Sequence, residues 1–400
     1  MIVGLRMEVF MEGTMNRWIA CVSAALLSLA MVGCTTVTPP RLTANHNDLG
    51  VKYLNENLYD KAIEEFLLAL EVSPDEPLIY NNLGLCYYQK NDLDRAIQYY
   101  KQAIDLDKNY ADAWNNMGMC YMAKEEYREA KDAFEKAAKT DKRLPDPLIN
   151  LGKLLIIEND LTGALETLIK ATELYVNIPE AHNLIGYIYT QQGDFDKAQR
   201  RFQIALEIDP RHAETHYNMG RLYVMQQRWD AALSEFNQVL QTDSGHVEAL
   251  NNMGFVYEQK GNLDEAERMF QRALDVEPDN TMALNNLGVI AMSRREDNKA
   301  EDLFRRVLAR EPASRDARYN LGVILMESGR LQEAEAEFRT ILSANADDPE
   351  ANLQLGVILA DRGARQEAVS HLRKFVQLAG PQYRQAVAEV QELIKQLGGR

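Results

Sequence analysis

The feature that most constrains the fold of this 400-residue chain is a strict internal repeat, whose period of about 34 residues is typical of helical repeat proteins. Glycine recurs at that spacing without a single insertion, and alanine recurs at a fixed distance after each glycine. The glycines are Gly50, Gly84, Gly118, Gly152, Gly186, Gly220, Gly254, Gly288, Gly322 and Gly356. The alanines are Ala62, Ala96, Ala130, Ala164, Ala198, Ala232, Ala266, Ala300, Ala334 and Ala368. Small residues at two fixed places predict two helices whose backbones approach closely, because a large side chain at either place would push them apart.

Other positions follow the same period. In most units an aromatic residue follows the alanine by four positions: Phe66, Tyr100, Phe134, Phe202, Phe236, Phe270, Phe304 and Phe338. Seven positions after the glycine, Asn or Gly predicts a turn with positive φ between the two helices: Asn57, Asn91, Asn159, Gly193, Gly261, Gly329 and Gly363. One such unit cannot bury its own apolar face, so neighbouring units are expected to stack.

This pattern resembles that of a known family. The segment NNLGLCYYQKNDLDRAIQYYKQAIDLD (81–107) is similar to the tetratricopeptide repeat, a helix–turn–helix unit of the same period. The resemblance covers residues 43–382 and implies an all-α, right-handed superhelical solenoid of ten repeats, whose first helices line the concave side. Residues 383–400 keep the helical period, and we expect them to form a C-terminal capping helix.

The N-terminal segment indicates where the protein is located. Read from Met15, where we expect translation to start, a short basic start precedes an apolar run that extends from Ile19 to Val32. The run suits a secretory signal and is too short to span a bilayer comfortably. The sequence MVGC, which ends in Cys34, resembles the bacterial lipobox. This resemblance implies that residues 1–33 are a lipoprotein signal peptide and that Cys34 becomes the lipidated N-terminus.

The residues after Cys34 extend this interpretation. Two or three acyl chains anchor a protein stably, and residues 34–42 are predicted to be the lipidated cysteine and a short Thr/Pro tether. Thr35 stands where an acidic residue would resemble an inner-membrane retention signal. We therefore expect a lipid anchor on the periplasmic face of a bacterial outer membrane. An ordinary signal peptide with a chance cysteine and an uncleaved anchor are the alternatives.

Helical phase places three positions of each first helix on the concave face: two before the repeat glycine, one after it and four after it. Two before the glycine, asparagine recurs as Asn82, Asn116, Asn150, Asn218, Asn252, Asn286 and Asn320. A carboxamide is both donor and acceptor, so a ladder of asparagines can pair with the main chain of an extended peptide. The alternative is that asparagine is simply common at this position of the family.

The other two concave positions are biased towards apolar residues. The candidate contacts are Leu85, Tyr88, Met119, Met122, Ile156, Tyr187, Phe255 and Met292. Exposed apolar surface usually marks a binding site, and methionine suits adaptable contacts. The alternative is that these residues pack between neighbouring helices. The fourth repeat, LGKLLIIENDLTGALETLIKA (151–171), lacks the aromatic residues and is expected to expose Ile156 and Ile157.

Charge and composition argue against several classes of function. The net charge of −16 disfavours binding to nucleic acid or to anionic lipid. Cys86 and Cys120 take the same position in adjacent repeats, about 8–10 Å apart, which exceeds the roughly 7 Å limit for a disulfide. Both are expected to be small core residues. His212 and His216 are expected to be structural.

No motif for catalysis is found in the sequence: no phosphate-binding glycine loop, no cysteine cluster with metal spacing and no serine elbow. No cofactor or metal is predicted. The chain is predicted to be a non-catalytic scaffold that binds peptide segments of protein partners. It resembles the tetratricopeptide lipoproteins of type IV pilus biogenesis, which implies secretin or pilus assembly proteins as partners. A role in exopolysaccharide export, and a regulatory subunit that presents substrates to an envelope enzyme, are the alternatives.

Overall fold

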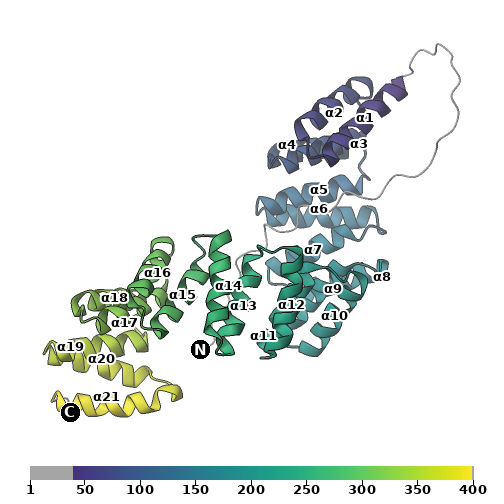
Figure 1. The fold of residues 1–400 in the computed structure, drawn as a ribbon. Coiled ribbons are helices and arrows are strands. Elements are labelled where there is room, and N and C mark those ends of the chain that lie inside the picture. Colours follow the sequence, from purple (N-terminus) through teal and green to yellow (C-terminus); the bar gives the residue numbers. More distant parts are fainter. Residues whose placement is uncertain (1–38, 399–400) are drawn as a thin grey trace. The chain divides into compact units, whose positions relative to one another are not determined.

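The computed structural model of the protein describes residues 39–398, with side chains described from Thr43 onward. Every regular element in this range is helical: α-helices and one short 3-10 helix (Figure 1). The predicted all-α class is thereby confirmed. None of the helices in this range is long and apolar enough to cross a membrane. Cys34 and the signal segment lie outside the described residues.

The described chain divides into two compact units, and the division falls between Ile188 and Tyr189. The first unit contains α1 (Pro39–Asn55), α2 (Tyr59–Val72), α3 (Pro77–Gln89), α4 (Leu93–Leu106), α5 (Ala111–Ala123), α6 (Tyr127–Thr140), α7 (Asp146–Ile157), α8 (Leu161–Leu174) and most of α9 (Pro179–Gln191). The second unit contains α10 (Phe195–Ile208), α11 (Ala213–Met225), α12 (Trp229–Thr242), α13 (Val247–Gln259), α14 (Leu263–Val276), α15 (Thr281–Ser293), α16 (Asp297–Arg310), α17 (Arg315–Glu327), α18 (Leu331–Ala344), α19 (Pro349–Asp361), α20 (Arg365–Leu378), η1 (Pro381–Tyr383) and α21 (Arg384–Gln396).

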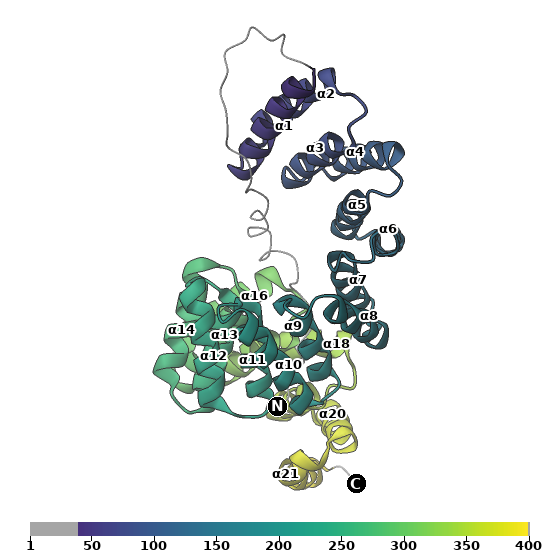
Figure 2. The same ribbon diagram turned by 90° about the vertical axis from the view of Figure 1, so that its right-hand side faces the viewer.

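The helices are arranged as a stack of antiparallel pairs within each unit (Figures 1 and 2). Within each unit, a first helix packs against the second helix that follows it, as in α3·α4 and α13·α14, and that second helix packs against the first helix of the next pair, as in α4·α5 and α14·α15. First helices also contact one another, as in α1·α3, α3·α5 and α5·α7 of the first unit. No such contact joins second helices in the described range. The first helices therefore form the tighter, inner row of each stack.

The repeat glycines lie against the ring of their own second helix. In seven repeats, a β-carbon added to the glycine would lie 2.5–2.7 Å from the aromatic side chain of that helix, as at Gly254 and Phe270. The aromatic side chains concerned are completely buried. Burying such a ring contributes about 1.5–3 kcal/mol. In the fourth and tenth repeats, Leu168 and Leu372 take the place of the ring.

Every helix pair turns at a residue with left-handed backbone geometry. All seven Asn and Gly residues expected at this turn have positive φ, which confirms the prediction. In the other three repeats Glu125, Gln227 and Arg295 take the same conformation, with φ of 60°, 57° and 60°. A side chain with a β-carbon is strained there by about 1–2 kcal/mol. The packing of the helix pair thus overrides the local preference of the residue.

The first helix begins earlier than expected. The tether was predicted to run to Leu42, but α1 starts at Pro39, so this prediction is wrong for residues 39–42. The physical reason is that Pro39 and Pro40 occupy the first turn of the helix. There the fixed φ of proline is helical and its missing N–H would have no partner within the helix.

The last helix covers the end of the second stack. Val390 and Ile394 of α21 are buried against Leu372 and Phe375 of α20. The ring of Tyr383 packs edge-on against Phe375, with their centroids 5.7 Å apart. The polar residues of α21 face away from this contact and are exposed.

The contact between Gly254 and Phe270 yields a test. Gly254→Ala places a methyl group inside the ring of Phe270, and we expect a loss of about 1–3 kcal/mol in local stability, as is typical of an overfilled core. Hydrogen exchange of the amides of α13 and α14 would measure it. The matched control is Gly245→Ala, because the nearest atom to an added β-carbon lies at 3.5 Å there. Equal exchange in both variants would contradict the proposed role of the contact.

Candidate functional site

The candidate site is the side of the first unit on which α3, α5 and α7 contact each other. Residues spaced four, three and three apart share one face of a helix. On these three helices that spacing selects Leu78, Asn82, Leu85 and Tyr88, then Asp112, Asn116, Met119 and Met122, and then Asp146, Asn150, Lys153 and Ile156. We call these twelve residues the inner face. Each helix contributes one residue from its first turn, one asparagine and two residues further along.

The apolar part of the inner face is partly open to solvent. Leu85, Tyr88, Met119 and Met122 are each partly exposed. Leu78, in the first turn of α3, is 43% exposed. These side chains therefore offer apolar surface beside the contacts that hold the helices together.

Two predicted contacts contribute little surface. Ile156 was expected to be exposed, but it is only 6% exposed, and Tyr187 is 6% exposed as well. The expectation for Ile156 is wrong because its side chain belongs to the buried core, whereas Tyr88 and Met122 at the same position of the two preceding repeats are partly exposed. Leu54, at the same position of the first repeat, is 9% exposed. In the second unit, Phe255 and Met292 pack against the core and are partly exposed.

The asparagines of the ladder join neighbouring repeats. The side-chain amide of Asn116 donates to Oδ1 of Asn81 at 3.0 Å, and that of Asn150 donates to Oδ1 of Asn115 at 2.9 Å. Asn82 donates to Asn47 at 3.2 Å, and Asn252 donates to the hydroxyl of Tyr217 at 3.2 Å. A carboxamide has two N–H donors and an acceptor oxygen, so one such bond leaves capacity for a peptide group.

The asparagines of the predicted ladder differ in how far their side chains are exposed to solvent. Asn116 and Asn150 are partly exposed, as are Asn286 and Asn320 of the second unit, whereas Asn82 and Asn218 are buried. Sequence reasoning missed the residues that accept these bonds, which lie three positions before the glycine. Their recurrence at the repeat spacing, as in Asn81 and Asn115, was the signal that could have shown them.

The histidines serve the packing of the repeats. Nδ1 of His216 lies 2.7 Å from the carboxylate of Glu235 on the second helix of its pair, and Nε2 lies 3.1 Å from the carbonyl oxygen of Pro210. Both partners are acceptors, so both ring nitrogens donate when the ring is protonated. The hydrogen bond to Glu235 raises the pKa of His216. Nδ1 of His212 accepts the N–H of Thr215 and so caps α11.

The two cysteines of the first unit have the predicted core positions. Cys86 and Cys120 are unpaired and completely buried. Burial raises the pKa of each thiol to about 12, so both stay protonated at neutral pH and are poor nucleophiles. Among residues 43–398, no three or more His, Cys, Asp or Glu side chains are grouped so that they could hold a metal ion.

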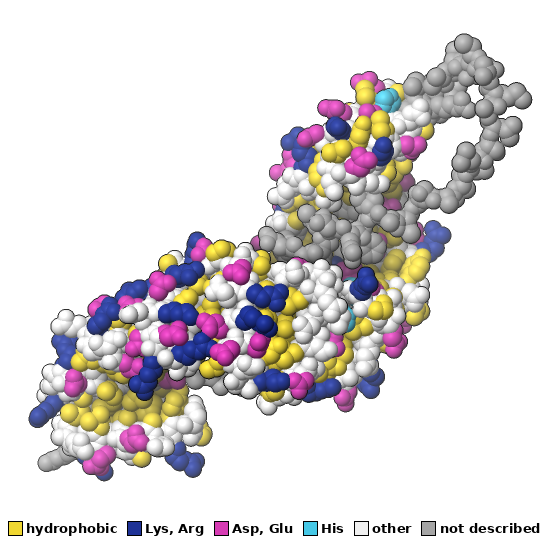
Figure 3. All heavy atoms as spheres, in the orientation of Figure 1, with side chains coloured by type: hydrophobic (Ala, Val, Ile, Leu, Met, Phe, Trp, Pro, Cys, Tyr) yellow, Lys and Arg dark blue, Asp and Glu magenta, His cyan; other side chains and the backbone are white. Residues whose placement is uncertain are grey.

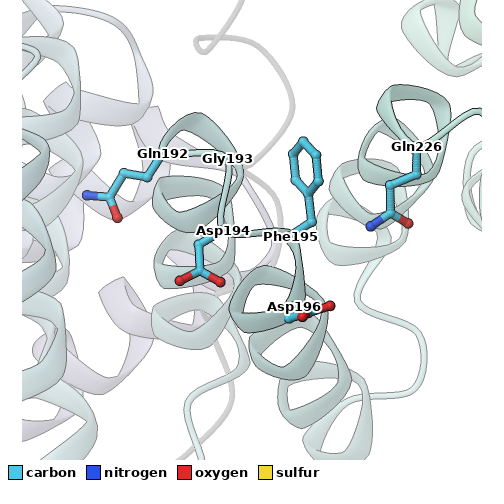
Figure 4. A pocket seen from close by; sticks show the side chains of 6 residues that line it. All are labelled: Gln192, Gly193, Asp194, Phe195, Asp196 and Gln226. Carbon is cyan, nitrogen blue, oxygen red and sulfur yellow. The ribbon is translucent and has the colours of Figure 1, made fainter.

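An open depression of about 480 Å³ lies in the second unit, between the end of α9 and the end of α11 (Figure 4). It is lined by Gln192, Gly193, Asp194, Phe195, Asp196 and Gln226. Asp194 caps α10 by accepting the N–H of Lys197 at 3.3 Å. The depression is thus the gap between two repeat turns, and its polar groups already serve the helix ends.

Sequence comparison assigns the family. Profiles described as tetratricopeptide repeat match residues 77–110, 111–143, 177–244, 225–287, 281–310, 298–355 and 329–383, and one described as TPR repeat matches residues 50–90. The chain belongs to the tetratricopeptide repeat family. The unmatched interval, 144–176, contains the divergent fourth repeat.

Solved structures with a similar fold come from varied sources. Yeast Tom70 is 15% identical, with 90% of this chain and 96% of that chain covered and a TM-score of 0.43. PilF of Pseudomonas aeruginosa is 20% identical, with 53% and 96% covered and a TM-score of 0.47. YrrB, described as a TPR protein with an unusual peptide-binding site, is 30% identical, with 55% and 95% covered and a TM-score of 0.32. No curated protein matches the chain.

The contact between His216 and Glu235 predicts a pH-dependent stability. A raised pKa in the folded state stabilises the protein below the unfolded value of about 6.5, and this stabilisation is lost as the pH rises through the folded value. Glu235→Gln should lower the pKa of His216 and should destabilise the protein more at about pH 5.5 than at about pH 9. NMR titration of the His216 ring would measure the shift. An unchanged pKa would show that Glu235 does not hold the ring.

Proposed function

We propose that the protein is a non-catalytic scaffold that binds peptide segments of partner proteins on the inner face. One observation carries this proposal. Leu85, Tyr88, Met119 and Met122 are partly exposed on first helices that touch each other, beside asparagines with spare hydrogen-bonding capacity. Apolar side chains supply the affinity in such a site, and amide groups can pair with the main chain of an extended ligand.

We further propose that Cys34 anchors this scaffold to the periplasmic face of the outer membrane. The support is the apolar run that ends in MVGC and the resemblance of that sequence to a lipobox. Together with the repeat array, this favours work in envelope assembly. The type IV pilus lipoproteins that the chain resembles suggest secretin or pilus assembly proteins as its partners.

The inner face can be tested by substitution. Met119→Ser combined with Met122→Ser should abolish capture of partners, because it removes apolar surface without opening the core. Ile156 is unsuited to this test, because a buried isoleucine also stabilises the fold. Met225→Ser, on the exposed part of α11, is the matched control. Capture would be measured by photo-crosslinking in cells, with helicity and melting temperature as checks on folding.

The identity of the captured protein separates the possible roles. With the photo-crosslinker at position 85 of the inner face, which the double variant leaves unchanged, secretin or pilus subunits would support a role in pilus assembly. Polysaccharide synthases or envelope hydrolases would instead support the export or regulatory alternatives. Equal capture by the double variant and the native protein would place the working surface away from the inner face.

The anchor has its own test. Cys34→Ala removes the thiol that would carry the lipid, so we expect the protein to move from the membrane fraction to the soluble periplasmic fraction after cell lysis. Fractionation and mass spectrometry of the mature N-terminus would measure this. Membrane association that persists in the variant after signal cleavage would contradict lipidation at Cys34.

A further inference from the structure

A row of carboxylates runs along the first turns of the first helices, six residues before the repeat glycine. Its members are Asp112, Asp146, Glu180, Glu214, Glu248, Asp316 and Glu350. Acidic residues are ordinarily favoured in the first turn because the helix dipole is positive there. Such a row is therefore not a binding site by itself. What distinguishes its members is whether a cation accompanies them.

In the second unit, basic side chains accompany three of these carboxylates, Glu248, Asp316 and Glu350. Glu248 lies 3.1 Å from Nδ1 of His246, and its pKa is lowered by that contact. Arg315 pairs with Asp316 at 3.1 Å and also with Glu350. Figure 3 shows Lys and Arg side chains interspersed with Asp and Glu over the visible face of α13 to α18. Arg315 therefore compensates the negative charge of Asp316 and Glu350.

In the first unit, compensation is incomplete. Lys153 of the inner face pairs with Glu180. Asp112 and Asp146 make no ion pair with any residue of the described range. Burial raises the pKa of Asp146, and the nearby Glu180 and Asp112 raise it further, although Lys153 opposes them. Burial and Asp141 raise the pKa of Asp112. Asp112 is exposed and Asp146 is partly exposed, so both carboxylates are open to a ligand and have no ion-pair partner in the described range.

The position of these carboxylates relates them to the apolar part of the inner face. On α5, Asp112 and Met119 are seven residues apart, which corresponds to about 10 Å along the helix axis. Asn116 lies between them and can pair with a backbone. A peptide chain that crossed α3, α5 and α7 over the asparagines would direct one edge towards Met119 and the other towards Asp112. Successive side chains of an extended peptide point to opposite sides.

We propose that the inner face binds an extended segment in which Lys or Arg alternates with apolar residues. The cationic side chains would lie against Asp112 and Asp146, and the apolar side chains would lie against Met119 and Tyr88. The inference rests on the proposed function, because it assumes that ligands bind on the inner face. We expect the segment to be basic because its cationic side chains would be attracted to Asp112 and Asp146 and would reduce the repulsion between these two carboxylates.

Three labelled peptides of equal length test this inference with the full chain: alternating Lys and Leu, alternating Ser and Leu, and alternating Glu and Leu. Fluorescence anisotropy would give the affinities. We expect the Lys peptide to bind tightest and to weaken as salt is raised. Asp112→Asn with Asp146→Asn should weaken the Lys peptide about three- to tenfold and leave the Ser peptide unchanged, as for two partly exposed ion pairs.

The controls separate the site from general attraction to an acidic protein. Asp316→Asn removes a carboxylate at the same repeat position of the second unit and should leave the Lys peptide unaffected. Asp112→Glu with Asp146→Glu keeps the charge and should retain binding. Circular dichroism would check that each variant keeps its helicity and melting temperature.

Two outcomes of these binding measurements would contradict the inference, and only one of them would also contradict the proposed function. If Met119→Ser with Met122→Ser weakens the Lys and Ser peptides equally, and the Asp→Asn pair changes neither, the inner face binds peptides but does not select cations. This outcome overturns the inference alone. If the methionine substitutions weaken none of the three peptides, both the inference and the assignment of the inner face are overturned.

Discussion

The close approach of a glycine to an aromatic ring is the contact on which the remaining structure depends. Because Gly254 has no side chain, the ring of Phe270 can lie directly against the backbone of the first helix, and the same contact recurs in most repeats. It sets the spacing within each helix pair, and identical pairs then stack with first helices in contact. Where leucine replaces the ring, as at Leu168 and Leu372, the helix pair still forms.

Much of the fold was predictable because small residues and turn residues encode it directly. The spacing of glycine and alanine indicated the helix pairs, and Asn57 or Gly261 indicated turns whose positive φ the structure confirms. The details of the inner face were less predictable. Helical phase shows which side of a helix a residue occupies, but it does not show what the next repeat places beside it. For that reason Ile156 was expected to be exposed, and the bond from Asn116 to Asn81 was missed.

The charge of the protein is organised more finely than its net value of −16 suggests. In the second unit, Arg330 and Arg339 bridge neighbouring repeats through Glu301 and Glu367, so charge there contributes to stacking. In the first unit, Lys90 and Lys124 similarly bridge to Asp60 and Asp94 at the repeat turns. The row at the first turns of α5 and α7 differs, because Asp112 and Asp146 have no such partner within the described residues. Within the row, Glu180 and Glu350 join neighbouring repeats through Lys153 and Arg315, whereas Asp112 and Asp146 do not.

The uninterrupted spacing of the repeats has a consequence for any ligand that crosses the stack. Neighbouring first helices in contact lie about 8–10 Å apart, and an extended peptide rises about 3.3 Å per residue, so about two to three residues span one repeat. A ligand displaced by one repeat would meet an equivalent set of side chains, and a uniform array could not fix its register. Repeats that differ from the others can fix the register. Lys153 and the buried Ile156 make α7 unlike α3 and α5. A peptide whose side chains fit α7 but not the other two helices can therefore bind in one register only.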